Sequence, residues 1–359
     1  DTGSAALDFS FDLDLWGKNR ANLRAATSDA DAAAIDVAQA RLLLATNIAS
    51  AYADLARLFA ERDVQADAVA SRVETQKLVA DRVAVGLDTR AELKQADAAV
   101  PAERTQLSQI DESIALTRNR LAALIGKGPD RGLSIQRPTL SFAARSVPAD
   151  VTTDLIGRRP DIVSARARVE ASAARIKAAR ADFYPSVSLT ALVGFQSLGL
   201  SNLFVSGSHN GQAAAAVSLP IFHGGEIRGK YRVARASYDE AVGSYDGAVA
   251  TAFHDVADAV TSQSMLGEQL AQSRQSLADA REAYAVAKLR YQGGLSNYLA
   301  VLTAQNSMLQ QQRVVVDLEA RAFTLDVALV RALGGGAVAA SPSPVSAAAG
   351  AVSKDKIHG

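Results

Sequence analysis

Cysteine is absent from the 359-residue sequence, and aromatic residues are sparse at 5 %. Without cysteine the chain forms no disulfide, no thiolate metal site and no cysteine nucleophile. Few bulky side chains and many alanines favour helices packed closely through small residues. No apolar run approaches the roughly 18 residues that a membrane-spanning helix needs. Basic and acidic residues balance at 38 each, so the composition gives no indication of nucleic-acid binding.

Motifs for catalysis or metal binding are also missing. The four histidines share no metal-ligand spacing, and none lies in an HExxH frame. The stretch GKGPDRG at 126–132 contains glycines but no Lys-Ser/Thr pair, so a phosphate loop is not indicated. No serine occupies a GxSxG elbow. We therefore expect no catalytic, cofactor-binding or metal site.

Proline and glycine are absent from Lys18 to about Val85, which predicts one uninterrupted helix about 100 Å long. A second such stretch runs from Glu226 to about Gln292, interrupted only by single glycines. Two apolar seams of seven-residue spacing follow this second stretch, one of which begins at Tyr231. Two seams indicate packing against two neighbouring helices, although a free-standing coiled coil gives a related periodicity.

Three short segments have the two-residue period of a β-strand. In LDFSFDLDLWG, residues 7–17, apolar side chains at odd positions from 7 to 13 alternate with polar ones at even positions from 8 to 14, three of them aspartates, and Trp16 closes the run. VSLTALVGF at 187–195 and AAAAVSLP at 213–220 predict a hairpin with one apolar face. Two or three amphipathic strands are too few to shield their own edges. We therefore expect them to form a closed sheet with the same strands of other copies of the chain. A membrane barrel gives the apolar face a lipid environment.

The chain contains an internal repeat. Arg82, Gly86 and Leu87 recur as Arg290, Gly294 and Leu295, at a constant offset of 208 residues. LWG at 15–17 corresponds to IFHG at 221–224 if one residue is inserted. Each unit is predicted as strand, aromatic-glycine corner, very long helix, tight turn and a helix of roughly 35 residues.

We divide the chain into four parts on this basis. Residues 1–126 form the first repeat, which lacks its beginning. Residues 127–180 form an equatorial linker and the start of the second repeat, residues 181–334 form the second repeat, and residues 335–359 are expected to form a disordered tail. The chain starts at Asp1 with neither methionine nor signal peptide, and the offset places one strand and its preceding helices upstream.

The segment 147–195 resembles the signature of bacterial outer-membrane factors, the TolC-like channels, and especially the nodulation-type (NodT) efflux lipoproteins. The matching elements are Pro148, Asp154-Leu155, Arg158-Arg159-Pro160-Asp161-Ile162, Ala178-Ala179-Arg180-Ala181, Phe183-Tyr184-Pro185 and Ser188-Leu189. Within this segment, Pro160 suits a first helical turn and Asp161 favours a helix N-terminus, so we expect a structural role there.

The resemblance implies a mainly α fold with a β-barrel portion. Long coiled helices would form an α-barrel through the periplasm, and amphipathic strands from a homotrimer would form a channel in outer-membrane lipid. Trp16, Phe183, Tyr184 and Phe222 would then lie at the membrane interface. No lipid-bearing cysteine can be assigned, because the chain contains none.

The function implied is a passive duct: the outer-membrane component of a tripartite efflux pump of a Gram-negative bacterium. Its partners would be a periplasmic adaptor (membrane fusion) protein and an inner-membrane transporter such as a proton-coupled RND pump. An outer-membrane channel for type I protein secretion is an alternative. A soluble periplasmic coiled-coil scaffold or adaptor is a second alternative from a different class.

The family resemblance also suggests functional positions. The adaptor would dock at two tips, Val85-Gly86-Leu87 and Gly293-Gly294-Leu295. Asp8, Asp12 and Asp14 would line the pore and favour cations. Acidic residues usually ring the closed aperture beyond the second tip, but Ala300 and Thr303 occupy those positions here. Any aperture ring is therefore expected to come from Glu92, together with Asp88.

Overall fold

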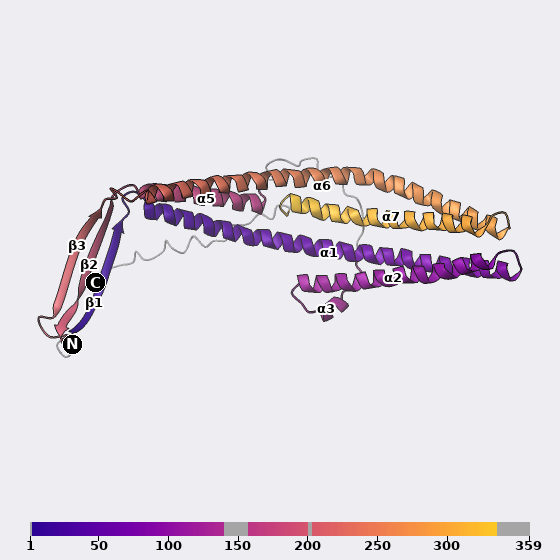
Figure 1. Cartoon of the computed structure of the whole chain (residues 1–359), viewed down its shortest axis with the longest axis horizontal. Coiled ribbons are helices and arrows are strands. Elements are labelled where there is room, and N and C mark those ends of the chain that lie inside the picture. The colour runs from indigo at the N-terminus through magenta and orange to yellow at the C-terminus, as the bar shows by residue number, and fades with distance from the viewer. Residues whose placement is uncertain (1, 140–156, 200–202, 336–359) are drawn as a thin grey trace, which may run out of the picture.

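The computed structural model describes residues 2–139, 157–199 and 203–335. Figure 1 shows an elongated molecule with a small sheet at one end and two helical hairpins whose turns lie at the other end. Pro148, Asp154-Leu155 and the predicted disordered tail from residue 336 onward lie outside the described residues.

Four helices make up most of the length. The two long helices are α1 (Lys18–Ala84) and α6 (Glu226–Gln292), each of 67 residues. The two shorter ones, of 35 residues each, are α2 (Arg90–Leu124) and α7 (Tyr298–Ala332). Each pair is displaced by 208 residues, so the predicted repeat is confirmed at the level of its helices. At 1.5 Å per residue each long helix measures about 100 Å.

The helices start and end as their sequences require. Gly17 and Gly225 are the left-handed N-cap residues of α1 and α6 and are themselves 208 positions apart. We expected one inserted residue in the second repeat, between the counterparts of LWG and IFHG. The two long helices nevertheless begin at the same offset of 208 residues. α2 begins with a capping box between Thr89 and Glu92, and Asn297 takes the same position before α7.

The three strands form one antiparallel sheet in the order β1-β2-β3. β1 spans Thr2–Leu13, β2 spans Ser186–Leu198 and β3 spans His209–Ser218, so the predicted hairpin is confirmed. Phe9 of β1 lies opposite Ala191 of β2, which lies opposite Ala213 of β3. Since facing residues point to the same side, the apolar positions of all three strands share one face.

The segment 127–180 contains a short helix, α3 (Pro129–Leu133), and all but the last residue of α5 (Pro160–Ala181). α5 packs between α1 and α6 beside the sheet (Figure 1). Pro160 lies in its first turn, as predicted. Buried Arg159 pairs with Asp161 at 2.8 Å and Asp255 at 3.1 Å, and it donates to the carbonyl of Ala332 at the end of α7 at 3.1 Å. The Arg-Pro-Asp motif therefore joins three helices, which is a structural role.

The core is distributed along the helices and consists largely of small side chains. Alanines such as Ala51, Ala252 and Ala259 are buried at helix contacts. The seam that begins at Tyr231 is buried at Ala252, Ala259 and Leu266. This arrangement agrees with the packing expected from the low aromatic content, because small residues let helix axes approach closely.

Candidate functional site: the helix tips, the strand face and their junction

The turn between α1 and α2 presents Val85, Gly86 and Leu87 at one end of the molecule. Gly86 has a φ of +77°, a left-handed conformation that glycine adopts without steric cost. Its N–H donates to the carbonyl of Val83 at 3.0 Å, and the N–H of Leu87 donates to the carbonyl of Arg82 at 2.9 Å. This pair of bonds is the Schellman motif, which closes the helix and leaves Val85 and Leu87 exposed.

The turn between α6 and α7 has the same geometry. Gly294 has a φ of +73°, and its N–H donates to the carbonyl of Tyr291 at 3.0 Å. The N–H of Leu295 donates to the carbonyl of Arg290 at 2.8 Å, and the Leu295 side chain is exposed. Gly293 precedes this turn as the C-cap residue. The two predicted tips are thus matching exposed turns, and adaptor docking there stays a prediction.

Asp88, a predicted aperture residue, is engaged inside the protein. Its side chain is only 6 % exposed and pairs with Arg82 at 3.0 Å. The hydroxyl of Tyr291 donates to the same carboxylate, and Arg82 donates to the carbonyl of Tyr291 at 2.9 Å. Burial, together with the bond to Asp88, raises the pKa of Tyr291 above its usual value. The cluster joins the first tip to the second long helix.

The other aperture candidates are also used locally. Glu92 accepts hydrogen bonds from the backbone N–H of Thr89 at 2.7 Å and from its hydroxyl at 2.9 Å. Ala300 donates its N–H to the Asn297 side chain at 3.2 Å, and the hydroxyl of Thr303 donates back within α7. Glu92 therefore acts first as a helix cap, and an acidic aperture ring built from it stays a prediction.

The two faces of β1 differ as predicted. Leu7, Phe9 and Phe11 are 81 %, 60 % and 52 % exposed, an unusual fraction for large apolar side chains in a sheet. Asp8 and Asp12 occupy the other face and are exposed too. One face of this strand thus suits lipid, and the other suits water.

Asp14 does not belong with Asp8 and Asp12. The strand ends at Leu13, and Asp14 lies in the turn before α1. Its carboxylate accepts the backbone N–H groups of Asn19 at 2.9 Å and Arg20 at 3.0 Å. The backbone N–H of Arg20 is the leading cause that holds the pKa of Asp14 below its usual value. Because it satisfies two free amides at the start of α1, we assign Asp14 a capping role in place of the expected pore-lining one.

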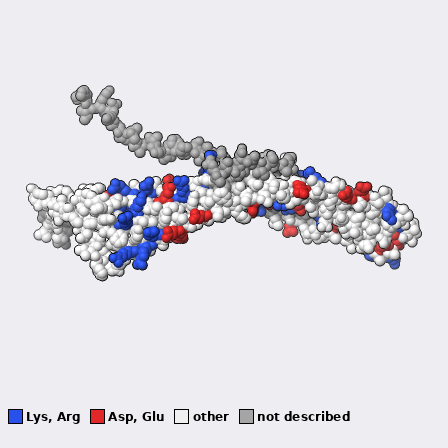
Figure 2. All heavy atoms as spheres, turned by 90° about the horizontal axis from the view of Figure 1, so that it is seen from above, with Lys and Arg blue, Asp and Glu red and all other residues white. Residues whose placement is uncertain are grey.

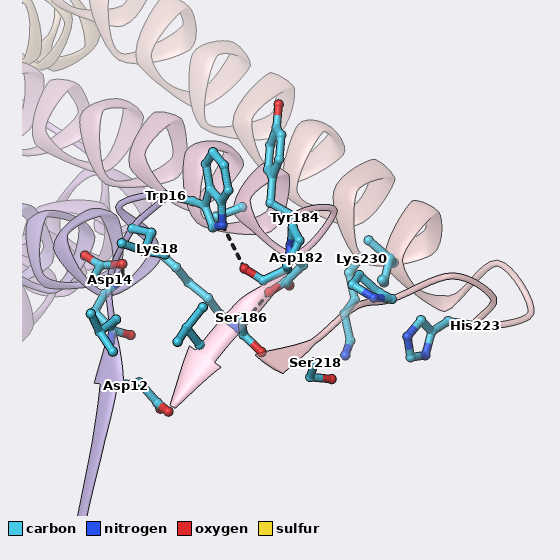
Figure 3. Close-up of a pocket in the computed structure, with 18 of the residues that line it drawn as sticks. Asp12, Asp14, Trp16, Lys18, Asp182, Tyr184, Ser186, Ser218, His223 and Lys230 are labelled. Atoms are coloured by element: carbon cyan, nitrogen blue, oxygen red, sulfur yellow. Dashed lines mark hydrogen bonds and ion pairs between the residues drawn. The ribbon is translucent and has the colours of Figure 1, made fainter. Parts of the chain in front are cut away.

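The junction between sheet and helices is lined by aromatic and charged side chains (Figure 3). Trp16 stacks on Tyr184 with ring centroids 4.6 Å apart and donates its indole N–H to the carbonyl of Pro185 at 2.8 Å. Lys18 pairs with Asp182 at 2.6 Å. These contacts fix the direction in which β1 and β2 leave the helices, around a cavity of about 430 Å³.

A buried polar layer between the two helical hairpins was not anticipated from the sequence. Arg72 of α1, only 5 % exposed, faces Glu103 of α2 at 3.4 Å and hydrogen-bonds to Gln305 and Asn306 of α7. Gln305 in turn donates to Ser71 at 2.7 Å. These residues are 31 to 234 positions apart, so no local pattern identifies the layer.

The described part of the chain contains neither a membrane-spanning helix nor a cluster of metal-ligating side chains. No helix there combines the length and apolar character needed to cross a membrane. No group of three or more histidine, aspartate or glutamate side chains there is arranged to hold a metal ion.

Comparison with known proteins gives consistent similarities. The sequence profile of the family described as "Outer membrane efflux protein" matches residues 1–127 and 151–335. The probable efflux pump outer membrane protein SepC of Pseudomonas putida is 33 % identical over 341 residues, 95 % of this chain and 71 % of that protein. The fusaric acid resistance protein FusA of Burkholderia cepacia is 38 % identical over 236 residues, 65 % of this chain and 44 % of that protein.

The crystal structure of the outer membrane protein VceC from Vibrio cholerae is similar over 94 % of this chain and 87 % of that chain. The TM-score is 0.86 and the sequence identity is 40 %. The similarity therefore covers the strands and the helices together.

Proposed function

The chain belongs to the outer membrane efflux protein family, and from this premise we propose that it is the outer-membrane channel component of a tripartite efflux pump. In this role it performs no covalent chemistry. It provides a passive duct through which small organic molecules, including drugs, leave the cell.

The observation that carries this proposal is the exposed apolar face of a sheet joined end-on to long helices. Leu7, Phe9 and Phe11 present large apolar surfaces that water would not favour, on the side of β1 opposite Asp8 and Asp12. A barrel assembled from several chains would place the first set against lipid and the second in the lumen. The helices, each about 100 Å long, would continue the duct through the periplasm.

A soluble scaffold accounts for the helices but leaves this sheet unexplained, because its apolar face and two edge strands would stay exposed to water.

Protein secretion uses the same kind of duct. The names of the relatives favour efflux of small molecules over it, since SepC is named for an efflux pump and FusA for resistance to an organic acid.

We infer that the partners are two further copies of the chain, a periplasmic adaptor and an inner-membrane transporter. The adaptor contact would lie at the two exposed tips, where equivalent residues of the two repeats share one backbone geometry. This repetition supports a partner that grips both tips alike.

Expression of the full-length protein in a bacterium whose own outer-membrane efflux channel has been deleted tests the proposal. We expect restored drug resistance, detergent-requiring trimers in the outer-membrane fraction, and single-channel conductance in planar bilayers. A buffer-soluble rod that gives no conductance would contradict the proposal.

A further inference from the structure

Lysine and arginine gather where the helices meet the sheet (Figure 2). We name this set the basic belt. It consists of Lys18, Arg20 and Arg24 in α1, Arg175, Lys177 and Arg180 in α5, and Arg228, Lys230, Arg232 and Arg235 in α6. All ten residues lie within ten positions of the sheet-proximal end of their helix, a band about 15 Å deep.

The stretches of α1 and α6 that follow the belt have the opposite charge. Residues 25–40 of α1 contain three aspartates and no lysine or arginine. Residues 236–273 of α6 contain six acidic residues and likewise no lysine or arginine. On the face drawn in Figure 2, basic side chains lie next to the sheet, acidic ones follow them, and both kinds occur towards the far end of the rod. Positive charge is therefore concentrated at one level of the molecule.

Helix stability explains this placement only in α5, which ends at the belt, because a helix C-terminus favours basic side chains. α1 and α6 both begin at the belt, and a helix N-terminus carries partial positive charge that favours acidic side chains. The first turn of α1 has no acidic residue but contains Lys18 and Arg20. Asp14 caps α1 and Glu226 lies in the first turn of α6, so the attraction of external anions rests on the exposed lysine and arginine side chains of the belt.

Part of the belt is satisfied within the chain. Lys18, Arg20, Arg175 and Lys230 pair with acidic side chains. The other six are exposed, and none has an ion pair with any of the residues that the structure describes: Arg24, Lys177, Arg180, Arg228, Arg232 and Arg235.

The belt residues of α6 lie on more than one face of that helix. Arg228, Arg232 and Arg235 follow the i, i+4, i+7 spacing of one face of α6, whereas Lys230 lies on a different face of the same helix. Two faces of α6 therefore present basic side chains at the level of the belt.

Three zones follow one another from the sheet to the helices: the exposed apolar face of β1, the aromatic side chains at the junction, and the belt. Trp16 and Phe222 are both exposed in the middle zone. This order matches the hydrocarbon, interface and headgroup zones of a phospholipid leaflet.

We propose that the basic belt binds the phosphate groups of anionic phospholipids in the periplasmic leaflet of the outer membrane. The proposal rests on the proposed function, which places the sheet in that membrane. Bound lipid would fix the depth at which the duct sits and would compensate the charge of the six exposed basic residues that have no ion pair within the described part of the chain.

Trp16 is a suitable reporter, because it is the sole tryptophan, is 52 % exposed and lies beside the belt. The protein is reconstituted in phosphatidylcholine vesicles, and quenching of Trp16 by brominated phosphatidylglycerol is compared with quenching by brominated phosphatidylcholine. One basic residue near an anionic surface contributes about 1 kcal/mol, or about fivefold in binding. We expect at least that preference for phosphatidylglycerol, with loss of most of it at 1 M salt, where the screening length is about 3 Å.

Two variants with equal charge change test the residues. The belt variant replaces the six unpaired residues with glutamine: Arg24, Lys177, Arg180, Arg228, Arg232 and Arg235. The control variant replaces six exposed basic residues far from the sheet with glutamine: Arg41, Lys77, Arg104, Lys127, Arg131 and Arg281. We expect the belt variant to bind the two lipids almost equally and the control variant to keep the preference.

The outcomes separate the two proposals. No quenching by either lipid would mean that the sheet is not in the bilayer, and the proposed function would fail. Equal quenching by both lipids in the unsubstituted protein would leave the proposed function standing and overturn the belt proposal. A belt variant that keeps the lipid preference but loses binding of a soluble polyanion such as heparin would assign the belt to a soluble ligand instead.

If the belt variant does not insert, the salt titration of the unsubstituted protein still decides the matter. A preference that is unchanged at 1 M salt would overturn the proposal.

Discussion

Replacement of Gly86 and Gly294 by valine perturbs both helix tips without disturbing their packing. A Cβ atom at either position meets no heavy atom within 4 Å, so the change creates no clash inside the chain. The cost comes from the backbone alone, because φ is +77° at Gly86 and +73° at Gly294. An L-residue in this region costs roughly 1–2 kcal/mol, so the double substitution costs about 2–4 kcal/mol per protomer. The branched side chain puts valine at the upper end of that range.

The cost falls on two exposed turns far from the sheet, so we expect trimers to persist in the membrane fraction. The bulk of valine at the exposed turns should weaken adaptor binding at least tenfold, equivalent to about 1.4 kcal/mol. Drug susceptibility of an expressing strain measures efflux, and co-purification with the adaptor measures docking. A double asparagine variant is the matched control, because asparagine tolerates the left-handed conformation while it still adds a side chain.

The docking hypothesis predicts that both variants lose efflux while their trimers remain. An asparagine variant that exports as well as the unsubstituted protein would show that the glycines serve only backbone geometry. Loss of trimers in the valine variant would likewise assign them to folding.

Three further predictions concern charged and polar groups. Tyr291→Phe removes the hydroxyl donor to Asp88, and we expect the tip to open more easily by about 1–3 kcal/mol, as measured by amide hydrogen exchange. Asp14→Asn should lower the melting temperature near neutral pH, because the pKa of Asp14 is depressed in the folded state and its ionised form stabilises the fold. The difference in melting temperature between the variant and the unsubstituted protein should be lost as pH falls below about 4, and a series of thermal unfolding curves over pH 2–7 measures it. Asp8→Asn with Asp12→Asn should reduce cation preference in planar bilayers, and unchanged selectivity at low salt would refute the assignment.

Local sequence patterns determined the elements of this protein. The absence of proline and glycine from position 18 to 85 leaves nothing to interrupt a helix, and the observed helix α1 ends at Ala84. The alternation in β1 requires only the two-residue period of an extended chain, so the strand could be identified without its partner. The offset of 208 relates the two halves, since equivalent helices begin and end at equivalent residues.

The tertiary structure decided which charged residues are free. Asp88 was a candidate aperture residue by position, but the hydroxyl of Tyr291, 203 positions away, donates a hydrogen bond to its carboxylate. Asp14 continued the alternation of the strand, yet the chain turns one residue earlier and the carboxylate caps α1. Arg72 and the basic belt became visible only when α1, α2, α5, α6 and α7 were placed side by side. Secondary structure follows from neighbours along the chain, whereas the state of a charge depends on groups that only folding brings within a few ångströms.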